Sequence, residues 1–388
     1  MIKNIAILGS TGSIGNTLIN YLKSNKKNLK IILLSTNKNY KKILIQAKSF
    51  NCKNLIITDK KVYNYVINSK NYKNYKIYNN FNSFKEIFSK KKLDYVMNSI
   101  TGLSGLIPTL NIIKFTKNIA IANKESIICG WNLIKKELQK NKTNFVPVDS
   151  EHFSIWYALR GINKNLIEKI FITASGGPFN TTKISNLKFV KKSEALNHPT
   201  WKMGKKISID SSTLMNKLFE IIEAKNIFNV DYENLSIIIH PESYIHSILK
   251  FKNGLIKIIA HDTTMAIPIS NSIDLINKKF IGSKQITIKK LNNLNFEKLN
   301  ERKFRIQEII DLLPNYNSLF ETVVVSANDK LVNLYLDNKI NYVDIKKEII
   351  NFIKLPEFYK YKRIKPKNIN QIINLSNYVS LKLEKKYV

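Results

Sequence analysis

The chain has 388 residues, 44% of them hydrophobic, which suits two or three folded domains and excludes a disordered basic tail. Its 63 Lys and Arg against 28 Asp and Glu give a net charge of +35, which first suggests nucleic acid or an anionic membrane as a partner. The 2 cysteines, Cys52 and Cys129, are too few for a disulfide framework and do not form a C-x-x-C zinc site. We therefore expect the protein in the reducing cytoplasm.

Two further features bear on location. The uncharged stretch 95–113 contains Asn98, glycines and Pro108, so we predict no membrane-spanning helix. A strand follows Met1 almost at once, so we expect no signal peptide and no export.

Between residues 1 and 148, short β-branched or aliphatic runs alternate with helix-length segments. The expected strands are Ile5–Leu8, Ile31–Leu34, Leu55–Ile57, Tyr95–Asn98, Ile119–Ile121 and Phe145–Val148. Strands separated in this way indicate βαβ units, so we predict an α/β domain over 1–148 built on a doubly wound parallel sheet.

The residue composition of the chain changes after residue 148. Dense groups of Ser, His, Asp, Glu and Gly over 149–270 are typical of loops that carry chemistry, and predict an α+β catalytic domain. The segment 271–300 is polar and irregular, with one expected strand at 285–288, and we interpret it as a connection. Apolar residues at helical spacing over 301–388 predict a small C-terminal helical domain.

A glycine-rich turn, Gly9–Gly15, follows the first strand and opens a helix. Glycines let the backbone approach a pyrophosphate, and the helix N-terminus offers it free N–H groups, so we expect a dinucleotide here. An ordinary strand-to-helix turn is the alternative, because the spacing here is G-x-x-G-x-x-G and the commoner dinucleotide-binding spacing is G-x-G-x-x-G.

The end of the second strand, Ser35–Asn39, has no carboxylate for a ribose 2′-hydroxyl. We therefore infer NADPH as the cofactor, with Lys38 as partner of the 2′-phosphate. The alternative is that Lys38 is one more surface lysine in a lysine-rich chain.

Carboxylates gather where the last parallel strand is expected to end. In extended backbone Asp149 and Glu151 project to one side, and such oxygen ligands suit Mg²⁺ or Mn²⁺ better than zinc. A helix N-cap explains the same residues equally well.

A second polar group begins at Ser211–Thr213, which resembles the start of a helix. Asn216, Lys217 and Glu220 would then share one face, offering a phosphate grip and a third carboxylate. Spacing cannot choose Glu220 over Glu223, and a solvated polar face is the ordinary alternative.

Two loops suit an anionic substrate. Ser175–Phe179 offers a hydroxyl and free amides to a phosphate, although a plain turn would look similar. His198–Lys206 combines an indole, a histidine and lysines, which fits a lid that excludes water. His240, His246 and His261 are at least as well explained as hydrogen-bonded structural histidines.

Seven motifs in order resemble one family. They are Gly-Ser-Thr-Gly-Ser-Ile-Gly at 9–15, Ala-Asn-Lys-Glu-Ser at 122–126, Val-Asp-Ser-Glu-His at 148–152, Ser-Gly-Gly-Pro-Phe at 175–179, His-Pro-x-Trp-x-Met-Gly at 198–204, Asp-Ser-x-Thr-x-Met-Asn-Lys at 210–217 and His-Pro-x-Ser-x-Ile-His-Ser at 240–247. The sequence thereby resembles the 1-deoxy-D-xylulose 5-phosphate reductoisomerase family.

The resemblance implies a Rossmann-like NADPH-binding domain and a cytoplasmic homodimer of the non-mevalonate isoprenoid pathway. It implies conversion of 1-deoxy-D-xylulose 5-phosphate to 2-C-methyl-D-erythritol 4-phosphate with NADPH and Mg²⁺ or Mn²⁺, and Co²⁺ as a further candidate. Retro-aldol cleavage and re-addition followed by hydride transfer would account for the change of skeleton.

The resemblance also assigns residues. The implied metal ligands are Asp149, Glu151 and Glu220, which resolves the choice between Glu220 and Glu223. The implied substrate contacts are Lys124, Ser150, Glu151, Ser175, His198, Trp201, Ser211, Asn216, Lys217 and Glu220, with Lys124 and the three carboxylates as the catalytic set. The implied NADPH contacts are Thr11, Gly12, Ser13, Ile14, Lys38, Asn39, Asn123, Glu125 and Gly204.

Several positions depart from the family pattern. Asn37 replaces a glycine, which we expect to be tolerated because asparagine enters the left-handed region readily. Leu218 also replaces a glycine, Ala266 stands in a segment that has lost its arginine, and Asp329 ends a reduced Asn-Ala-Ala-Asn-Glu element. These departures bear on stability or lid support more than on activity.

Two other classes of protein compete with this interpretation. An NADPH oxidoreductase without rearrangement would need the nucleotide motif but not the carboxylates and phosphate grip. A nucleic-acid-binding protein is suggested by the charge, but lysines outnumber arginines and are spread along the chain, so we expect no specific nucleic acid partner.

Lys, Asn and Ile are enriched together, which a bias towards A and T in the gene explains. Lys38, Lys124 and Lys217, with Lys202, Lys205 and Lys206, are the lysines expected to face phosphorylated anions.

Overall fold

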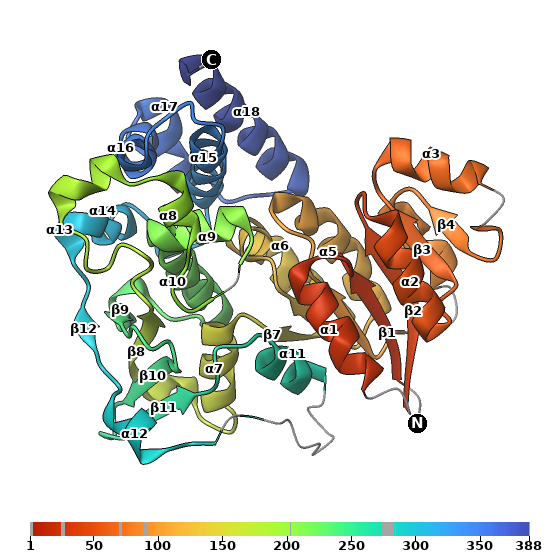
Figure 1. The fold of residues 1–388 in the computed structure, drawn as a ribbon, viewed down its shortest axis with the longest axis horizontal. Helices are drawn as coiled ribbons and strands as arrows, with labels where there is room; N and C mark the ends of the chain where they lie inside the picture. Colours follow the sequence, from red (N-terminus) through yellow and green to blue (C-terminus); the bar gives the residue numbers. More distant parts are fainter. Residues whose placement is uncertain are drawn as a thin grey trace. The chain divides into compact units, whose positions relative to one another are not determined.

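The computed structural model describes residues 3–24, 28–69, 72–88, 92–201, 203–273, 283 and 285–387. Contacts divide the chain into two units (Figure 1). Unit 1 contains Met1–Ile127, Asn132–Asp149 and Met265–Ile281, and unit 2 contains Ile128–Trp131, Ser150–Thr264 and Gly282–Val388. Lys202 and part of the predicted connection 271–300 lie outside the described residues.

Unit 1 is built on a parallel sheet of the order β4-β3-β2-β1-β5-β6-β7 in the described residues. Its strands are β1 (Lys3–Leu8), β2 (Leu29–Thr36), β3 (Asn54–Ile57), β4 (Lys76–Tyr78), β5 (Tyr95–Asn98), β6 (Asn118–Ile121) and β7 (Asn144–Pro147). Its helices are α1 (Ser13–Lys23), α2 (Tyr40–Phe50), α3 (Lys60–Asn68), α4 (Phe84–Ile87), α5 (Leu106–Ile112), α6 (Lys124–Asn141) and α11 (Ala266–Ile273). The strand order reverses between β1 and β5, the point where doubly wound sheets bind ligands.

Burial explains why unit 1 folds in this way. Ile5–Leu8 of β1 is buried on both faces, as expected for a central parallel strand covered by helices. On α1, Leu18, Ile19 and Leu22 recur at helical spacing and face the core. The α/β prediction is confirmed, whereas β4 was missed because its three residues are exposed or half-buried and show no apolar run.

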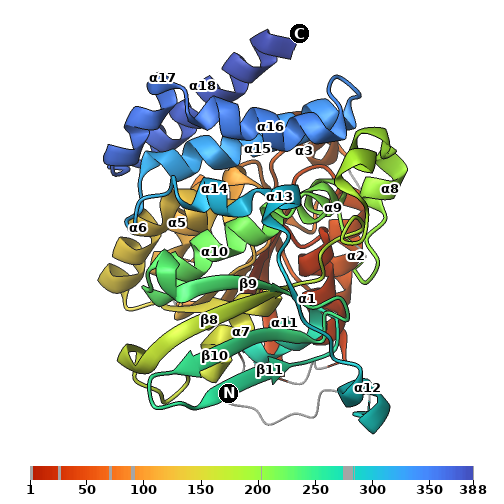
Figure 2. The same ribbon diagram turned by 90° about the vertical axis from the view of Figure 1, so that its left-hand side faces the viewer.

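Unit 2 contains a mixed sheet of the order β11-β10-β8-β9-β12 in the described residues. Its strands are β8 (Ile167–Ala174), β9 (Leu235–Ile239), β10 (Ile245–Phe251), β11 (Ile256–Ala260) and β12 (Glu297–Lys298). Its helices include α7 (Ser150–Ala158), α8 (Lys192–Leu196), α9 (Lys205–Ser212), α10 (Met215–Phe228) and α12 (Ile288–Asn292). Ile155, Ile170 and Ile221 share one buried core, which joins α7 and α10 to the sheet (Figure 2).

Helices follow the mixed sheet to the end of the chain. They are α13 (Glu301–Phe304), α14 (Ile306–Ile310), α15 (Leu319–Leu336), α16 (Tyr342–Ile353), α17 (Pro356–Tyr359) and α18 (Ile369–Tyr387). The predicted helical pattern is therefore present after residue 301. The strand predicted at 285–288 is wrong, because Thr287 caps α12 and the chain turns into a helix at Ile288.

The predicted domain ranges remain a prediction, and the division by contacts differs from them: it places Ile128–Trp131 in unit 2, and Asp149 and Met265–Ile281 in unit 1. Residues 265–270 were expected in the catalytic domain, but the structure groups Met265–Ile281 with unit 1. The reason is packing: α11 lies against α1, and Tyr95 of β5 shares a hydrogen bond with Ser272 at 2.6 Å. Among the residues that the structure describes, no helix is both long and apolar enough to cross a membrane.

Candidate functional site

The glycine-rich turn connects β1 to α1. Gly9 has a φ of +76°, and a Cβ atom there would lie 2.9 Å from the backbone of Ser99, so only glycine fits. A Cβ atom on Gly15 would lie 2.5 Å from the Gly9 carbonyl oxygen. Gly12 stands at the N-cap of α1 and contributes no side chain there, which leaves the helix N-terminus open to an anion.

The turn is tied to the loop after β2. The Thr11 and Thr36 hydroxyls share a hydrogen bond at 2.7 Å, and the Lys42 ammonium donates to the Thr11 carbonyl at 3.1 Å. The Lys38 ammonium is exposed and lies 3.7 Å from the carboxylate of Asp59. Asn39 caps α2 by accepting the Lys42 amide hydrogen, so its side chain orders this loop.

The start of α6 holds three more predicted residues. Asn123 caps the helix by accepting the Ser126 amide hydrogen at 2.7 Å, and its side-chain amide donates to the carbonyls of Ile100 and Gly102. Glu125 lies in the first helical turn, and the Lys124 ammonium donates to the Asp149 carboxylate. Thr11–Ile14, Lys38, Asn39, Asn123 and Glu125 thus all belong to unit 1, whereas Gly204 caps α9 in unit 2.

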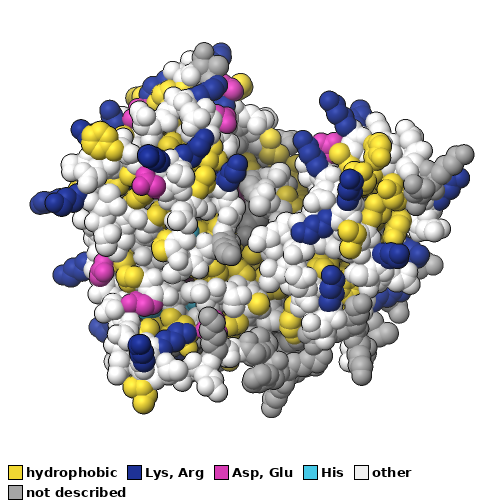
Figure 3. Space-filling view, viewed as in Figure 1, with side chains coloured by type: hydrophobic (Ala, Val, Ile, Leu, Met, Phe, Trp, Pro, Cys, Tyr) yellow, Lys and Arg dark blue, Asp and Glu magenta, His cyan; other side chains and the backbone are white. Residues whose placement is uncertain are grey.

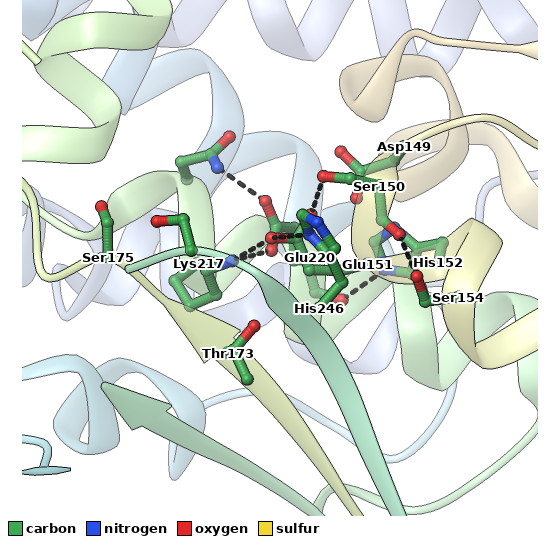
Figure 4. Close-up of polar contacts among 12 residues, drawn as sticks. Asp149, Ser150, Glu151, His152, Ser154, Thr173, Ser175, Lys217, Glu220 and His246 are labelled. Carbon is green, nitrogen blue, oxygen red and sulfur yellow. Dashed lines mark hydrogen bonds and ion pairs between the residues drawn. The ribbon is translucent and has the colours of Figure 1, made fainter. Parts of the chain in front are cut away.

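Three carboxylates meet where the chain leaves β7. One oxygen each from Asp149, Glu151 and Glu220 lies within 4.8 Å of the others (Figure 4). Glu220 is buried, and the Lys217 ammonium donates both to Glu220 and, at 3.2 Å, to Glu151. Oxygen donors of this kind suit Mg²⁺ or Mn²⁺, so the residues present fit the metal.

The backbone at this cluster differs from the expected one. Extended backbone was predicted for 149–151, but α7 begins at Ser150 and places Glu151 in its first turn. A helix start here does not exclude a metal site, because the Glu151 carboxylate interacts favourably with the dipole of α7 and still reaches the cluster. The Ser150 hydroxyl donates to Glu151 at 2.5 Å.

Neighbouring groups fix the orientation of the carboxylates. Asn216 donates to Glu220 at 2.6 Å, and a ring nitrogen of His152 lies 2.9 Å from the Glu220 carbonyl oxygen. The other ring nitrogen of His152 lies 3.6 Å from Glu223, which is not part of the carboxylate cluster. His246 approaches Glu151 at 3.9 Å. No role was predicted for His152 from the sequence.

The other histidines have hydrogen-bond partners, as expected for structural residues. His246 stacks on His261 with ring centroids 3.7 Å apart, and His261 Nδ1 lies 2.8 Å from the Asp262 carbonyl oxygen. Burial lowers the pKa of His261 to about 4, so this ring is neutral at physiological pH. His240 Nδ1 lies 2.8 Å from the Asn295 carbonyl oxygen.

The predicted substrate loop and lid meet at one hydrogen bond. His198 Nδ1 accepts the backbone N–H groups of Thr200 and Trp201, so Nε2 carries the proton and donates to the Ser175 hydroxyl at 3.0 Å. Burial, assisted by the charge of Lys217, lowers the pKa of His198 to about 4. The Gly177 amide also donates to Ser175 at 3.1 Å, which leaves the serine hydroxyl proton for another acceptor.

The helix predicted to start at Ser211–Thr213 is wrong. These residues end α9, and α10 begins at Met215 after Leu214 adopts a φ of 58°. Asn216, Lys217 and Glu220 still share one face because all three are on α10. Lys206, which was expected to face an anion, forms ion pairs with Asp210 at 3.0 Å and Asp329 at 2.9 Å.

The departures from the family pattern have structural counterparts. Asn37 is not among the non-glycine residues with positive φ, so the expected left-handed conformation is wrong, and its side chain donates to Thr58 at 2.9 Å. Leu218 is fully buried, Ala266 begins α11, and Asp329 retains an ion pair with Lys206.

Three further residues near the site were not predicted from the sequence. Lys42 reaches the Thr11 carbonyl, and Tyr342 and Lys346 of α16 reach the carbonyls of Ser212 and Thr213. A lysine or tyrosine inside a helical pattern carries no sequence signal for such long-range contacts.

The doubly wound sheet with an open glycine turn, together with the carboxylate cluster, defines a nucleotide-dependent, metal-assisted oxidoreductase. Comparison with known proteins gives the particular family. Three domain families match the chain: 1-deoxy-D-xylulose 5-phosphate reductoisomerase at 5–130, its C-terminal domain at 145–228, and a further DXP reductoisomerase C-terminal domain at 262–380.

Relatives that match over the whole chain belong to the same family. The 1-deoxy-D-xylulose 5-phosphate reductoisomerase of Pelagibacter ubique is 56% identical over 98% of both chains, and that of Clostridium tetani is 37% identical over 99% of this chain and 100% of the other. The Zymomonas mobilis enzyme solved with NADPH has a TM-score of 0.86 at 29% identity and 98% coverage of both chains. A DOX-P reductoisomerase solved with NADPH, fosmidomycin and magnesium has a TM-score of 0.89 at 26% identity, covering 100% of this chain and 98% of the other.

The chain therefore belongs to the 1-deoxy-D-xylulose 5-phosphate reductoisomerase family. It is an NADP-dependent oxidoreductase that converts 1-deoxy-D-xylulose 5-phosphate to 2-C-methyl-D-erythritol 4-phosphate, a step towards isoprenoid precursors, with NADPH and a divalent metal ion.

Proposed function

We propose that Asp149, Glu151 and Glu220 hold the divalent ion of this reaction, Mg²⁺ or Mn²⁺. The observation that carries the proposal is the convergence of their oxygens within 4.8 Å, with Glu220 buried. A divalent ion bound there supplies Lewis-acid polarisation of the substrate carbonyl and stabilises negative charge on its oxygens. Lys124 and Lys217, which pair with these carboxylates, partly offset their mutual repulsion before the metal binds.

The chain's own residues then orient the substrate. Lys124 donates hydrogen bonds towards the reacting oxygens, and Ser150 positions Glu151 through its hydroxyl. Ser175, His198, Ser211, Asn216 and Lys217 hold the phosphate group. Neutral His198 directs the Ser175 hydroxyl proton away from itself, towards the phosphate.

The lid begins at His198 and carries Trp201, whose ring lies edge-on to His246 at 6.4 Å. An indole at this place covers the metal and phosphate groups and excludes water during reduction. Binding energy from the phosphate drives closure, so the phosphate contributes to turnover as well as to affinity.

NADPH would occupy the turn and loop of unit 1. Gly12, Ser13 and Ile14 present the N-terminus of α1 to the pyrophosphate, with the Thr11 hydroxyl beside it. Lys38 and Asn39 would contact the 2′-phosphate, and Asn123, Glu125 and Gly204 complete the set. Asp59, which faces Lys38 in the free protein, would release it to the phosphate.

We also infer that the protein is cytoplasmic and forms a homodimer. The homodimer is supported by an apolar row on the sheet of unit 2, where Ile258, Ile248 and Phe171 are in register across β11, β10 and β8. Ile258 is exposed, and Ile248 and Phe171 are half-buried. Exposed apolar faces of this kind mark protein interfaces, and a second copy is the partner that the family resemblance supplies.

The experiment follows NADPH absorbance with 1-deoxy-D-xylulose 5-phosphate and Mg²⁺ for the wild type and for Glu151→Gln. Removing one ligand charge should lower turnover at least about 100-fold while the dissociation constant of NADPH, measured by fluorescence, stays within error. Fosmidomycin should inhibit the wild type. Near-normal turnover of the variant would remove Glu151 from the site, and unchanged activity after exhaustive chelation would favour a reductase that needs no metal.

A further inference from the structure

The turn between α9 and α10 is strained. Leu214 has a φ of 58° and a ψ of 13°, a left-handed conformation that costs a bulky non-glycine residue free energy. Such a conformation persists only where surrounding contacts enforce it. Ser211 precedes this turn and Asn216 and Lys217 follow it, so its geometry sets the spacing of three proposed phosphate contacts.

Two side chains of α16 hold the turn. The Tyr342 hydroxyl donates to the Ser212 carbonyl at 2.6 Å, and the Lys346 ammonium donates to the Thr213 carbonyl and to the Phe304 carbonyl. Tyr342 and Lys346 are one helical turn apart and share a face of α16. They supply donors to carbonyls at the C-terminal end of α9, which has no following helical N–H groups to pair them.

The same tyrosine supports the other phosphate segment. Phe179, which ends the Ser175–Phe179 loop, packs edge-on against the Tyr342 ring with centroids 5.0 Å apart. Gly177 comes so close to Ser211 that a Cβ atom would lie 2.8 Å from the Ser211 carbonyl oxygen. The loop and the turn therefore contact each other directly and share one support.

We propose that Tyr342 and Lys346 are positioning residues that fix the phosphate subsite by holding the carbonyls of Ser212 and Thr213. The proposal rests on the proposed function, in which Ser211, Asn216 and Lys217 bind the substrate phosphate. With these carbonyls held by α16, the Ser211 hydroxyl and the first turn of α10 keep the spacing that a phosphate needs. Loss of either contact lets the strained turn relax, which weakens phosphate binding.

The burial of Lys346 makes its variant informative. Burial lowers the pKa of Lys346 to about 7, so keeping an ammonium there works against folding at neutral pH. Lys346→Met removes this buried charge and retains most of the side-chain volume. Loss of this charge offsets part of the cost of leaving the Thr213 and Phe304 carbonyls without a donor, so the variant should fold, and its melting temperature reports the net effect on stability.

The test compares Tyr342→Phe and Lys346→Met with matched controls. Tyr335→Phe removes the hydroxyl of a ring 6.0 Å from Tyr342, and this hydroxyl has no hydrogen-bond partner among the described residues. Lys347→Met removes the charge of an exposed neighbour on α16. Measurements are kcat and KM for 1-deoxy-D-xylulose 5-phosphate, calorimetric binding of inorganic phosphate, NADPH affinity and the melting temperature.

Each of the two variants should raise the substrate KM and the phosphate dissociation constant about 3- to 10-fold, the usual effect of one lost hydrogen bond, because each removes one hydrogen bond to the turn. NADPH affinity should stay unchanged, and both controls should match the wild type. A parallel loss of NADPH affinity would show a general structural effect and overturn the proposal.

Ser211→Ala separates this proposal from the one on which it rests. If Ser211→Ala weakens phosphate binding and the α16 variants do not, the positioning role is wrong and the phosphate site stands. If Ser211→Ala has no effect on phosphate binding while the α16 variants weaken it, the assignment of Ser211 fails and the support of the turn stands. If none of the three changes phosphate binding, both are wrong.

Discussion

Glu220 and Glu223 lie one helical turn apart on α10, and their surroundings differ. Glu220 joins Asp149 and Glu151, whereas Glu223 lies 3.6 Å from His152. Both side chains are buried, so exposure does not separate them. At the residue scale, the direction of each side chain decides which one can bind a metal ion.

The two glutamates therefore form a matched pair of variants. Glu220→Gln should raise the Mg²⁺ concentration needed for half-maximal activity at least about 100-fold, because an anionic oxygen ligand becomes a neutral amide. Glu223→Gln should keep a metal requirement close to that of the wild type. The measurement is a Mg²⁺ titration of NADPH oxidation together with calorimetric Mn²⁺ binding. Equal losses in both variants would contradict the assignment of Glu220.

The residue types of this site were predictable, but their geometry was only partly so. Asp149 and Glu151 stand close together in the sequence, and the chemistry of carboxylates alone suggested a metal. The choice between Glu220 and Glu223 depends on the rotation of α10 about its axis. The spacing of apolar residues does not fix this rotation closely enough to separate two glutamates that are one helical turn apart. Tyr342 lies 130 residues from Ser212, so no local pattern could connect them.

At the scale of elements, the N-terminus of α15 contains an unusual buried acid. Glu321 completes a capping box by accepting hydrogen bonds from the amide and hydroxyl of Ser318. Its other oxygen is buried with no hydrogen-bond partner among the described residues. Burial raises the pKa of Glu321 to about 7, despite the opposing effect of these hydrogen bonds and of Lys225.

This pKa predicts a stability that depends on pH. The folded state binds the proton of Glu321 up to about pH 7, whereas an unfolded glutamate releases it near pH 4.5. The contribution to stability is therefore fully present below pH 4.5 and is lost as the pH rises through 7. Its full size is on the order of 3 kcal/mol.

Glu321→Gln tests this prediction because glutamine stays neutral at every pH. Thermal unfolding between pH 5 and 8 should give a melting temperature that falls less with rising pH in the variant than in the wild type. Glu233→Gln, which alters an exposed glutamate, should follow the wild type. A variant whose pH dependence parallels that of the wild type would exclude a raised pKa at Glu321.

Elements with long apolar runs were predicted well, and short or polar ones were not. Every residue of Ile5–Leu8 and Tyr95–Asn98 is buried; the first segment is a continuous aliphatic run, and the second is apolar except for Asn98. The break between α9 and α10 was missed because Leu214, a residue that ordinarily continues a helix, adopts a left-handed conformation under tertiary contacts. Segment 285–288 has strand-like residues, but all four are exposed, and Thr287 caps the helix that begins at Ile288.

At the scale of the whole molecule, the net charge of +35 sets the physical behaviour of the protein. On the face in Figure 3, Lys and Arg side chains are spread over both units rather than gathered in one stripe. A dispersed charge of this kind favours weak, salt-sensitive binding of polyanions without sequence selectivity. It also opposes the association of two identical copies, because like charges repel.

The proposed homodimer can be tested against that repulsion. The apolar row of Ile258, Ile248 and Phe171 would attract the two copies, and their net charge would repel them. Salt screens the repulsion, so it should strengthen dimerisation. An interface held by ion pairs would instead be weakened by salt. Sedimentation of the wild type should therefore give a lower dimer dissociation constant at 0.5 M than at about 0.05 M salt. Ile258→Glu should give monomers, whereas Leu381→Glu on α18 should not, although the two side chains are 53% and 55% exposed. A dimer that survives Ile258→Glu, or that dissociates as salt rises, would place the interface elsewhere.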